Sequence, residues 1–328
     1  MNFVYSHGLY DKNTTGKYPC YYKARNDKRR YSILNNRTYK PVLLVCCLPQ
    51  VMVNGLPGKM SSEVLNVLFE RKLPVVPYSL TAENQIELFY HPKLSKQQPI
   101  SLLRPSQRAN RIERILEDYP RLIAVDYTHP DAVNSNALFY QKYQIPFVMG
   151  TTGGDREQLV QSTLQSNIYA VIAPNMGKQI VALQTILNRM AQNFPGVFQN
   201  YRLQVTESHQ QTKADTSGTA KEIIQSFVKM GAHFEYSEDL RMIRSPVEQQ
   251  QELKIPPEYL SGHAFHTYRL TSPDKSVEIA FQHNVLGRNI YAQGTVDAVV
   301  FLWNKIQQKA SKKLYNMMDV LTEQLPNN

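Results

Sequence analysis

The fold is decided by the stretch Val51-Met-Val-Asn-Gly-Leu-Pro-Gly-Lys-Met60. Its apolar beginning, 51–53, predicts a strand, and a glycine turn follows at once. Beyond the turn, apolar residues recur at helical spacing as far as Glu70. A strand, a glycine turn and a helix form the context of a dinucleotide-binding turn, in which glycine lets the backbone approach a pyrophosphate. Ser61 occupies the third glycine position, so a simple tight turn is the alternative interpretation.

Strands and helices are then predicted to alternate as far as Ile172. Strands are expected at 42–48, 73–80, 122–125, 145–149 and 168–172, with helices around 112–116 and 132–143. This alternation predicts an α/β fold with a Rossmann-like, doubly wound parallel sheet. The stretch 91–110 is rich in Pro, Gln, Ser and Lys, and it is interpreted as a surface excursion.

Polar or glycine-containing clusters follow three of these strands, at 126–129, 150–152 and 174–176. Ligands of doubly wound sheets bind beyond the carboxyl ends of the strands, so these clusters predict a cofactor site. NAD-preferring folds usually place an acidic residue at the end of the second strand, whereas this strand ends at Ser79-Leu-Thr81. Together with Lys59 in the glycine turn, this ending favours NADPH over NADH.

The second half of the chain predicts an α+β substrate-binding domain with a mixed sheet. Its expected elements are a helix at 177–191, a strand ending near Ser208, a helix from Ala220, strands at 263–271 and 277–283, and a returning helix at 296–305. The stretch 238–257 is interpreted as a long loop. The predicted divisions are a basic leader (1–40), a dinucleotide-binding domain (41–176), a substrate-binding and oligomerisation domain (177–284) and a C-terminal segment returning to the dinucleotide-binding domain (285–328).

The stretch Glu207–Ala220 joins a strand to a helix and carries the most reactive side chains. His209 and Lys213 precede the triplet Ser217-Gly-Thr219 at the helix start. A helix N-terminus with small residues presents free N–H groups to an anion. A histidine and a lysine beside it suit acid catalysis on an anionic substrate. The alternative is a polar loop with a Ser/Thr cap.

Composition excludes several classes of protein. The chain has 328 residues, 42% of them apolar and 20% charged, and no apolar run approaches the roughly 20 residues of a transmembrane helix. Residues 1–40 hold nine Lys or Arg against two Asp, and therefore most of the net charge of +10. The rest of the chain is only mildly basic, which does not indicate a nucleic-acid-binding surface. Residues 1–40 are either a targeting segment or a disordered arm. Three cysteines form no disulfide framework, and we expect no metal site because no ligand spacing is recognisable.

These motifs together resemble those of the 4-hydroxy-tetrahydrodipicolinate reductase (dihydrodipicolinate reductase) family, from about Val51 to Lys305. The family carries Glu-x-His-His-x-x-Lys-x-Asp-x-Pro-Ser-Gly-Thr-Ala, which the stretch at 207–220 matches with two departures. Gln210 replaces the second histidine, and the proline before the triplet is missing. These departures resemble the plant-type branch, as do the motifs at 148–156, 175–179 and 262–266.

The resemblance implies a role for each motif. The cofactor-binding residues would be Gly55, Leu56, Pro57, Gly58, Lys59 and Met60 at the pyrophosphate, and Gly150, Thr151, Thr152, Ala173, Pro174, Asn175 and Met176 around the nicotinamide. His209 and Lys213 would be the catalytic acid–base pair, without a decision on which donates which proton. Ser217, Gly218 and Thr219 would bind the substrate, as would Gln210, which stands where the family has its second histidine.

The resemblance also implies the reaction and its setting. The enzyme would reduce 4-hydroxy-tetrahydrodipicolinate with NADPH, or alternatively with NADH, and release water. The reaction would belong to lysine (diaminopimelate) biosynthesis. Its partner would be a small dicarboxylate, with no nucleic acid or membrane, in a homodimer or a tetramer. A bacterial source implies the cytoplasm, and a plant or algal source implies the plastid stroma. The alternatives are a non-catalytic, reductase-like assembly factor in a plastid and a reductase of another small anionic imine.

Overall fold

The computed structural model describes residues 48–83, 85–93 and 98–323. The predicted leader 1–40 lies outside the described residues, as do 42–47 of the predicted strand 42–48. Among the helices that are described, none combines the length and the apolar character needed to cross a membrane.

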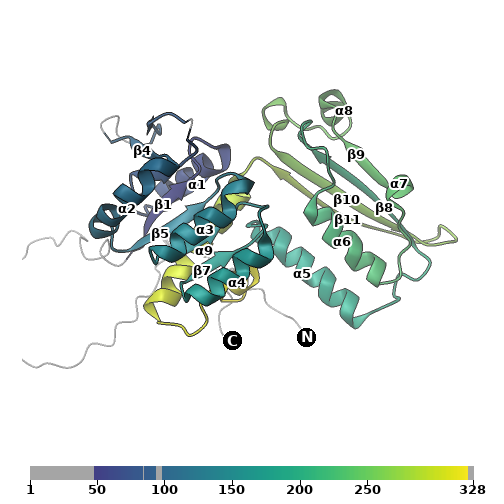
Figure 1. The fold of residues 1–328 in the computed structure, drawn as a ribbon. Coiled ribbons are helices and arrows are strands. Elements are labelled where there is room, and N and C mark those ends of the chain that lie inside the picture. The colour runs from purple at the N-terminus through teal and green to yellow at the C-terminus, as the bar shows by residue number, and fades with distance from the viewer. Residues whose placement is uncertain (1–47, 84, 94–97, 324–328) are drawn as a thin grey trace, which may run out of the picture. The chain divides into compact units, whose positions relative to one another are not determined.

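The first sheet contains five strands, all paired in parallel (Figure 1). Their order across the sheet is β1 (Gln50–Asn54), β5 (Leu122–Asp126), β6 (Phe147–Met149), β7 (Ala170–Ile172) and β12 (Leu314–Tyr315). Parallel pairing places the carboxyl ends of the strands along one edge. The three clusters predicted to bind cofactor therefore share that edge, as expected.

Helices cover both faces of this sheet, because successive side chains of each strand point in opposite directions. Val51 and Val53 pack in one core with α1 (Lys59–Glu70) and α9 (Asn289–Gln307). Met52 packs in a second core with α2 (Pro105–Asp118), α3 (Val133–Lys142) and α4 (Arg156–Ser166). Two apolar cores on opposite faces confirm the predicted doubly wound, Rossmann-like fold.

The second sheet is mixed, which was also predicted. Its order is β11 (Glu278–Leu286), β10 (His263–Thr271), β8 (Arg202–His209) and β9 (Leu240–Ile243). β10 is antiparallel to both β11 and β8, whereas β8 and β9 run parallel. Leu203 and Val205 pack on one face with α5 (Lys178–Asn193) and α6 (Gly218–Lys229). Figure 1 shows both helices lying along that face.

The interpretation of 91–110 as a surface excursion was wrong. The segment contains β4 (Ile100–Leu103), which pairs with β2 (Tyr78–Leu80) and β3 (Leu88–Phe89), and the beginning of α2. Ile100, Leu102 and Leu103 are buried, although polar residues surround them in the sequence. Pro105 is compatible with α2 because it occupies the first turn, where a backbone N–H would have no partner within the helix.

The long loop expected at 238–257 was wrong for a similar reason. The chain forms α7 (Tyr236–Asp239), β9, α8 (Pro246–Gln251) and a 3₁₀ turn at Pro257–Tyr259. β9 is an edge strand whose residues Arg241 and Met242 are exposed, so it lacks the apolar alternation that reveals a half-buried strand. Pro246 again occupies the first turn of a helix.

The C-terminal segment packs against the first sheet. α9 begins at Asn289 rather than at 296, so Gly294 lies inside the helix. A Cβ atom at Gly294 would lie 1.7 Å from the carbonyl oxygen of Met176. The glycine therefore lets α9 approach the end of β7 closely. β12 and α10 (Met317–Glu323), which follow, were not predicted.

Candidate active site

The glycine turn after β1 has the geometry of a close backbone approach. Gly55 adopts φ of +96°, and a Cβ atom there would lie 2.2 Å from the carbonyl oxygen of Tyr127. Only glycine fits both conditions. Ser61 is buried in the third glycine position and donates a hydrogen bond to the carbonyl of Asn54, at 2.9 Å. The serine therefore closes the turn from β1 to α1 rather than obstructing it.

A cleft of about 550 Å³ opens beside this turn. Lys59 and Glu63 line it from α1, and Arg288 and Glu258 line it from the C-terminal half of the chain. Lys59 Nζ lies 3.4 Å from Ser261 Oγ, and Arg288 donates to the carbonyl of the same serine at 3.1 Å. Lys59 begins α1, whose first turn has no acidic residue, and Lys59 and Arg288 offset the carboxylates of Glu63 and Glu258 in the cleft, so the start of α1 fits a dinucleotide phosphate.

A buried carboxylate, Asp126, holds the strand ends together. Its oxygens accept hydrogen bonds from Tyr140 Oη at 2.7 Å, Asn136 Nδ2 at 2.9 Å and Thr151 Oγ1 at 3.0 Å. Asn54 Nδ2 donates to the hydroxyl of Tyr140 at 2.8 Å. This network links the ends of β1, β5 and β6, and it positions the segment Gly150–Thr152 that was predicted to bind the nicotinamide.

The other predicted nicotinamide segment, Ala173–Met176, lies next to the predicted substrate residues. Asn175 Oδ1 accepts from the backbone N–H of Gly177 at 2.8 Å, and its Nδ2 lies 3.5 Å from Thr219 Oγ1. Thr219 belongs to the first turn of α6, which starts at Gly218. Residues that the sequence assigned separately to cofactor and to substrate are therefore neighbours in the structure.

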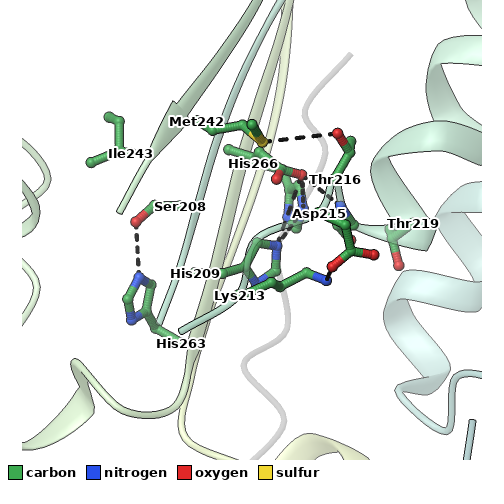
Figure 2. Close-up of polar contacts among 12 residues, drawn as sticks. Ser208, His209, Lys213, Asp215, Thr216, Thr219, Met242, Ile243, His263 and His266 are labelled. Carbon is green, nitrogen blue, oxygen red and sulfur yellow. Dashed lines mark hydrogen bonds and ion pairs between the residues drawn. The ribbon is translucent and has the colours of Figure 1, made fainter. Parts of the chain in front are cut away.

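Figure 2 shows the loop between β8 and α6. The ammonium of Lys213 donates to Asp215 Oδ1 at 2.9 Å, and Thr219 lies at the nearby start of the helix. Gly218 is exposed with open space beside it, so the helix start is accessible to a ligand. The carbonyl of Gln210 accepts from the backbone N–H of Lys213 at 2.9 Å, and no hydrogen bond of the Gln210 side chain is recorded within the described residues.

Glu207 is completely buried, and it organises this loop from beneath. One of its oxygens accepts from the backbone N–H of Ser217 at 3.0 Å, and the other is paired with the guanidinium of Arg244. Arg244 also donates to the backbone carbonyl of Lys213 at 2.8 Å and lies 3.4 Å from that of Asp215. The ion pair therefore ties the strand, the loop and the start of α6 together.

His209 ends β8 and is almost completely buried. Its Nε2 lies 3.2 Å from Nε2 of His266 on β10, and Gln249 of α8 donates to its backbone carbonyl at 2.7 Å. Burial, assisted by the positive charges of Arg244 and Lys213, lowers the pKa of His209 to about 3. The imidazole is consequently neutral near pH 7.

Three buried side chains of the kinds that can bind a metal lie close together, which the sequence interpretation did not recognise. Glu207, His209 and His266 offer three donor atoms that lie within 4.8 Å of one another. The ligands are far apart in the chain, and only the register of β8 against β10, which places His266 opposite Glu207, brings them together. No local spacing could have revealed them, although the Glu-x-His alternation places two of them on one face of a strand.

The comparison with known families agrees with this geometry. Residues 49–176 match the family model described as dihydrodipicolinate reductase, N-terminus, and residues 180–321 match dihydrodipicolinate reductase, C-terminus. This chain belongs to the dihydrodipicolinate reductase family. It is therefore an oxidoreductase, of a family that uses a nicotinamide cofactor.

Proteins from plants are similar to this chain over most of its length. The "probable 4-hydroxy-tetrahydrodipicolinate reductase 1, chloroplastic" of Oryza sativa subsp. japonica is 48% identical over 83% of this chain and 78% of its own length. The "4-hydroxy-tetrahydrodipicolinate reductase 2, chloroplastic" of Arabidopsis thaliana is 48% identical over 83% and 77%. A solved dihydrodipicolinate reductase from Paenisporosarcina sp. TG-14, with bound dipicolinate, shares the fold at a TM-score of 0.57. It is 17% identical and covers 82% of this chain and 97% of its own.

Sequence interpretation of this reductase missed two further residues, Arg244 and Gln249. Both contact the loop or strand end that carries His209 and Lys213, and both lie in the stretch 238–257 that was interpreted as a loop. An isolated arginine and one of several adjacent glutamines give no periodic signal, so the sequence offered little to distinguish them.

The buried ion pair gives a stability prediction. Replacing Arg244 with Met leaves the Glu207 carboxylate buried without its cation, so the free energy of unfolding should fall by about 3–5 kcal/mol. Adding Glu207→Gln to that variant should restore part of the loss, since the charge is then removed. Urea denaturation measures both effects.

The matched control for that prediction is Arg241→Met in the neighbouring strand. Arg241 pairs with Glu248 and Glu252 on the surface, so its loss should cost less than about 1 kcal/mol. Equal effects of the two arginine substitutions would contradict the organising role of Glu207 and Arg244.

Proposed function

We propose that this reductase converts 4-hydroxy-tetrahydrodipicolinate to tetrahydrodipicolinate, with hydride from NADPH and release of water, in lysine biosynthesis. The observation that carries the proposal is the contact between Asn175 and Thr219. It brings the segment that follows β7 of the parallel sheet against the start of α6, with His209 at the end of β8 and Lys213 on the loop after it. The names of the plant relatives support the same substrate.

The dinucleotide would lie along the carboxyl edge of the parallel sheet. Residues 55–60 would hold its pyrophosphate, and 150–152 with 173–176 would flank the nicotinamide, which supplies hydride when the cofactor is bound. The end of β2 carries the buried, uncharged Thr81, whose carbonyl accepts from Arg108 at 2.9 Å. A strand end without a carboxylate and with a guanidinium beside it favours the 2′-phosphate of NADPH.

The substrate is a ring with a carboxylate on each side of its nitrogen. One carboxylate would accept from the backbone N–H groups of Gly218 and Thr219, where the helix dipole also favours an anion, and Ser217, whose N–H already donates to Glu207, would contribute its hydroxyl group. Gly218 leaves that approach open, because it has no side chain. Gln210 remains a proposed contact, since an amide can donate to a carboxylate.

Lys213 is assigned as the proton donor. The 4-hydroxyl group must leave first, because hydride can add at ring carbon 4 only after water has been eliminated across carbons 4 and 5. His209, neutral near pH 7, would accept the proton of carbon 5 and pass it to the departing hydroxyl group, which leaves as water. As hydride then reaches carbon 4, negative charge develops toward the ring nitrogen and carbon 5, and the ammonium of Lys213, whose side chain is more exposed than that of His209, would supply the proton to this conjugated system. Asp215 positions the ammonium.

The setting is proposed from the relatives. Their names place them in chloroplasts, and a plastid location is the one that we infer for this protein. We also infer a homodimer. The face of the mixed sheet that is turned away from α5 and α6 includes the exposed residues Gln204, Gln282 and Asn284, and it is where an oligomer contact would form.

Replacing Lys213 with Ala should lower kcat for substrate-dependent NADPH oxidation by about 10²–10⁴-fold, because the proton donor is removed. The assay uses freshly generated 4-hydroxy-tetrahydrodipicolinate, and thermal unfolding verifies that the variant is folded. Lys221→Ala, on the exposed side of α6, is the matched control and should retain wild-type turnover. A Lys213→Ala enzyme with normal kcat would remove the assigned role, and an inactive wild type that binds NADPH would favour the non-catalytic alternative.

The pH dependence separates the two possible donors. With its pKa near 3, His209 stays neutral from pH 8 to pH 5, so kcat/KM should show no rise as the pH falls through 6.5. An imidazolium donor would instead make kcat/KM increase as the pH falls through that value, because the charged form becomes populated. Initial rates between pH 5 and 8, in buffers containing EDTA, measure the profile. A rise that His209→Gln abolishes would reverse the assignment.

A further inference from the structure

Three donor atoms converge beneath the loop: Nε2 of His209, Nε2 of His266 and one carboxylate oxygen of Glu207. The two nitrogens are 3.2 Å apart, and the oxygen lies 4.0 Å from His209 and 3.8 Å from His266. A triangle with these sides has a circumscribed radius of about 2.1 Å, which matches the roughly 2.0–2.2 Å of zinc–imidazole and zinc–carboxylate bonds. One ion could therefore reach all three atoms without a rearrangement of the backbone.

The surroundings hold the three ligands in place. Each comes from a paired strand, and His266 lies directly opposite Glu207 in the register. Arg244 and the backbone N–H of Ser217 donate to the Glu207 carboxylate, as outer partners commonly do for metal-binding carboxylates. The side chains are buried, so little conformational entropy remains to be lost when an ion binds.

The electronic state of the site also suits a cation. Burial lowers the pKa of both His209 and His266, so each imidazole is neutral near pH 7 and keeps a lone pair on one of its two ring nitrogens. Nδ1 of His266 has no hydrogen-bond partner within the described residues, so the ring proton is free to reside there and leave a lone pair on Nε2. Asp215 balances the charge of Lys213, whereas Arg244 shares the charge of Glu207 and weakens the attraction for a cation.

We propose that Glu207, His209 and His266 form a zinc site, and that Zn²⁺ bound there reversibly inhibits the reductase. Two imidazoles and one carboxylate select Zn²⁺ or a similar transition metal over Mg²⁺ and Ca²⁺, which prefer oxygen ligands. Inhibition rests on the proposed function, because the ion occupies the nitrogen of His209 that would assist the reaction. Binding of the metal does not depend on that function.

Cobalt is the probe for the test, since Co²⁺ in such a site absorbs visible light and reports binding without an activity assay. The full chain carries Cys20, Cys46 and Cys47, which also bind these ions, so a background variant has all three replaced by Ser. We expect one equivalent of Co²⁺ to give a visible band that Zn²⁺ removes. The substrate and dipicolinate are omitted, because a ring nitrogen flanked by two carboxylates chelates metals itself.

Histidine variants in that background decide the location. His266→Gln and His209→Gln should each weaken Co²⁺ binding at least about tenfold, while His283→Gln, which removes the ring stacked on His266, should leave the affinity unchanged. Thermal unfolding verifies that each variant is folded, and a result from one folded variant, His266→Gln or His209→Gln, is enough to decide the location. No visible band, or equal affinity in the wild-type ligand set and the folded ligand variants, would overturn the site. If the metal binds as expected but leaves NADPH oxidation unaffected, the inhibition is overturned while the site stands.

Discussion

The structure depends on one buried charge, the carboxylate of Glu207. Burying an unpaired carboxylate costs several kcal/mol, so the chain must supply partners, and it supplies Arg244 and the N–H of Ser217. Satisfying that charge brings the end of β8, the loop and the first turn of α6 into one arrangement. The partly exposed Lys213 and the exposed Gly218 are then held on a well-packed support, which would position the proposed proton donor.

A second constraint operates at the carboxyl edge of the parallel sheet. Asp126 is likewise buried, but it is satisfied by neutral donors from Tyr140, Asn136 and Thr151 rather than by a cation. Gly294 lets α9 pack against the carbonyl of Met176 on the same edge. The segment after β7 of the first sheet contacts the start of α6, which packs on the second sheet, where Asn175 approaches Thr219. The residues proposed to bind cofactor and those proposed to bind substrate therefore lie on separate sheets but next to each other.

Local sequence patterns predicted most of the secondary structure and the fold, because they reflect directly which residues are buried and where the chain turns. The strand and glycine turn at 51–60 and the alternation of strands and helices led to the correct fold, and the resemblance at 207–220 indicated the correct family. The failures at 91–110 and 238–257 share a physical origin. Their strands are short or exposed on an edge, and Pro105 and Pro246 begin helices, where proline is favourable rather than disruptive.

The contacts that support the site could not be predicted in this way, because they join residues distant in sequence. His266 meets Glu207 through strand register, and Gln249 reaches His209 from a helix that the sequence did not reveal. Burial then determines the protonation of His209, whose low pKa distinguishes it from Lys213. Tertiary packing thus favours Lys213 over His209 as the proposed acid, a choice that the motif leaves open.

The most direct test of this account is a crystal structure of the protein with NADPH and dipicolinate. The account predicts one dipicolinate carboxylate on the backbone N–H groups of Gly218 and Thr219, with Lys213 Nζ within hydrogen-bonding distance of the ring or its substituents. It also predicts the nicotinamide between that ring and the residues 150–152. Dipicolinate bound away from the start of α6, or Lys213 directed away from the ligand, would contradict it.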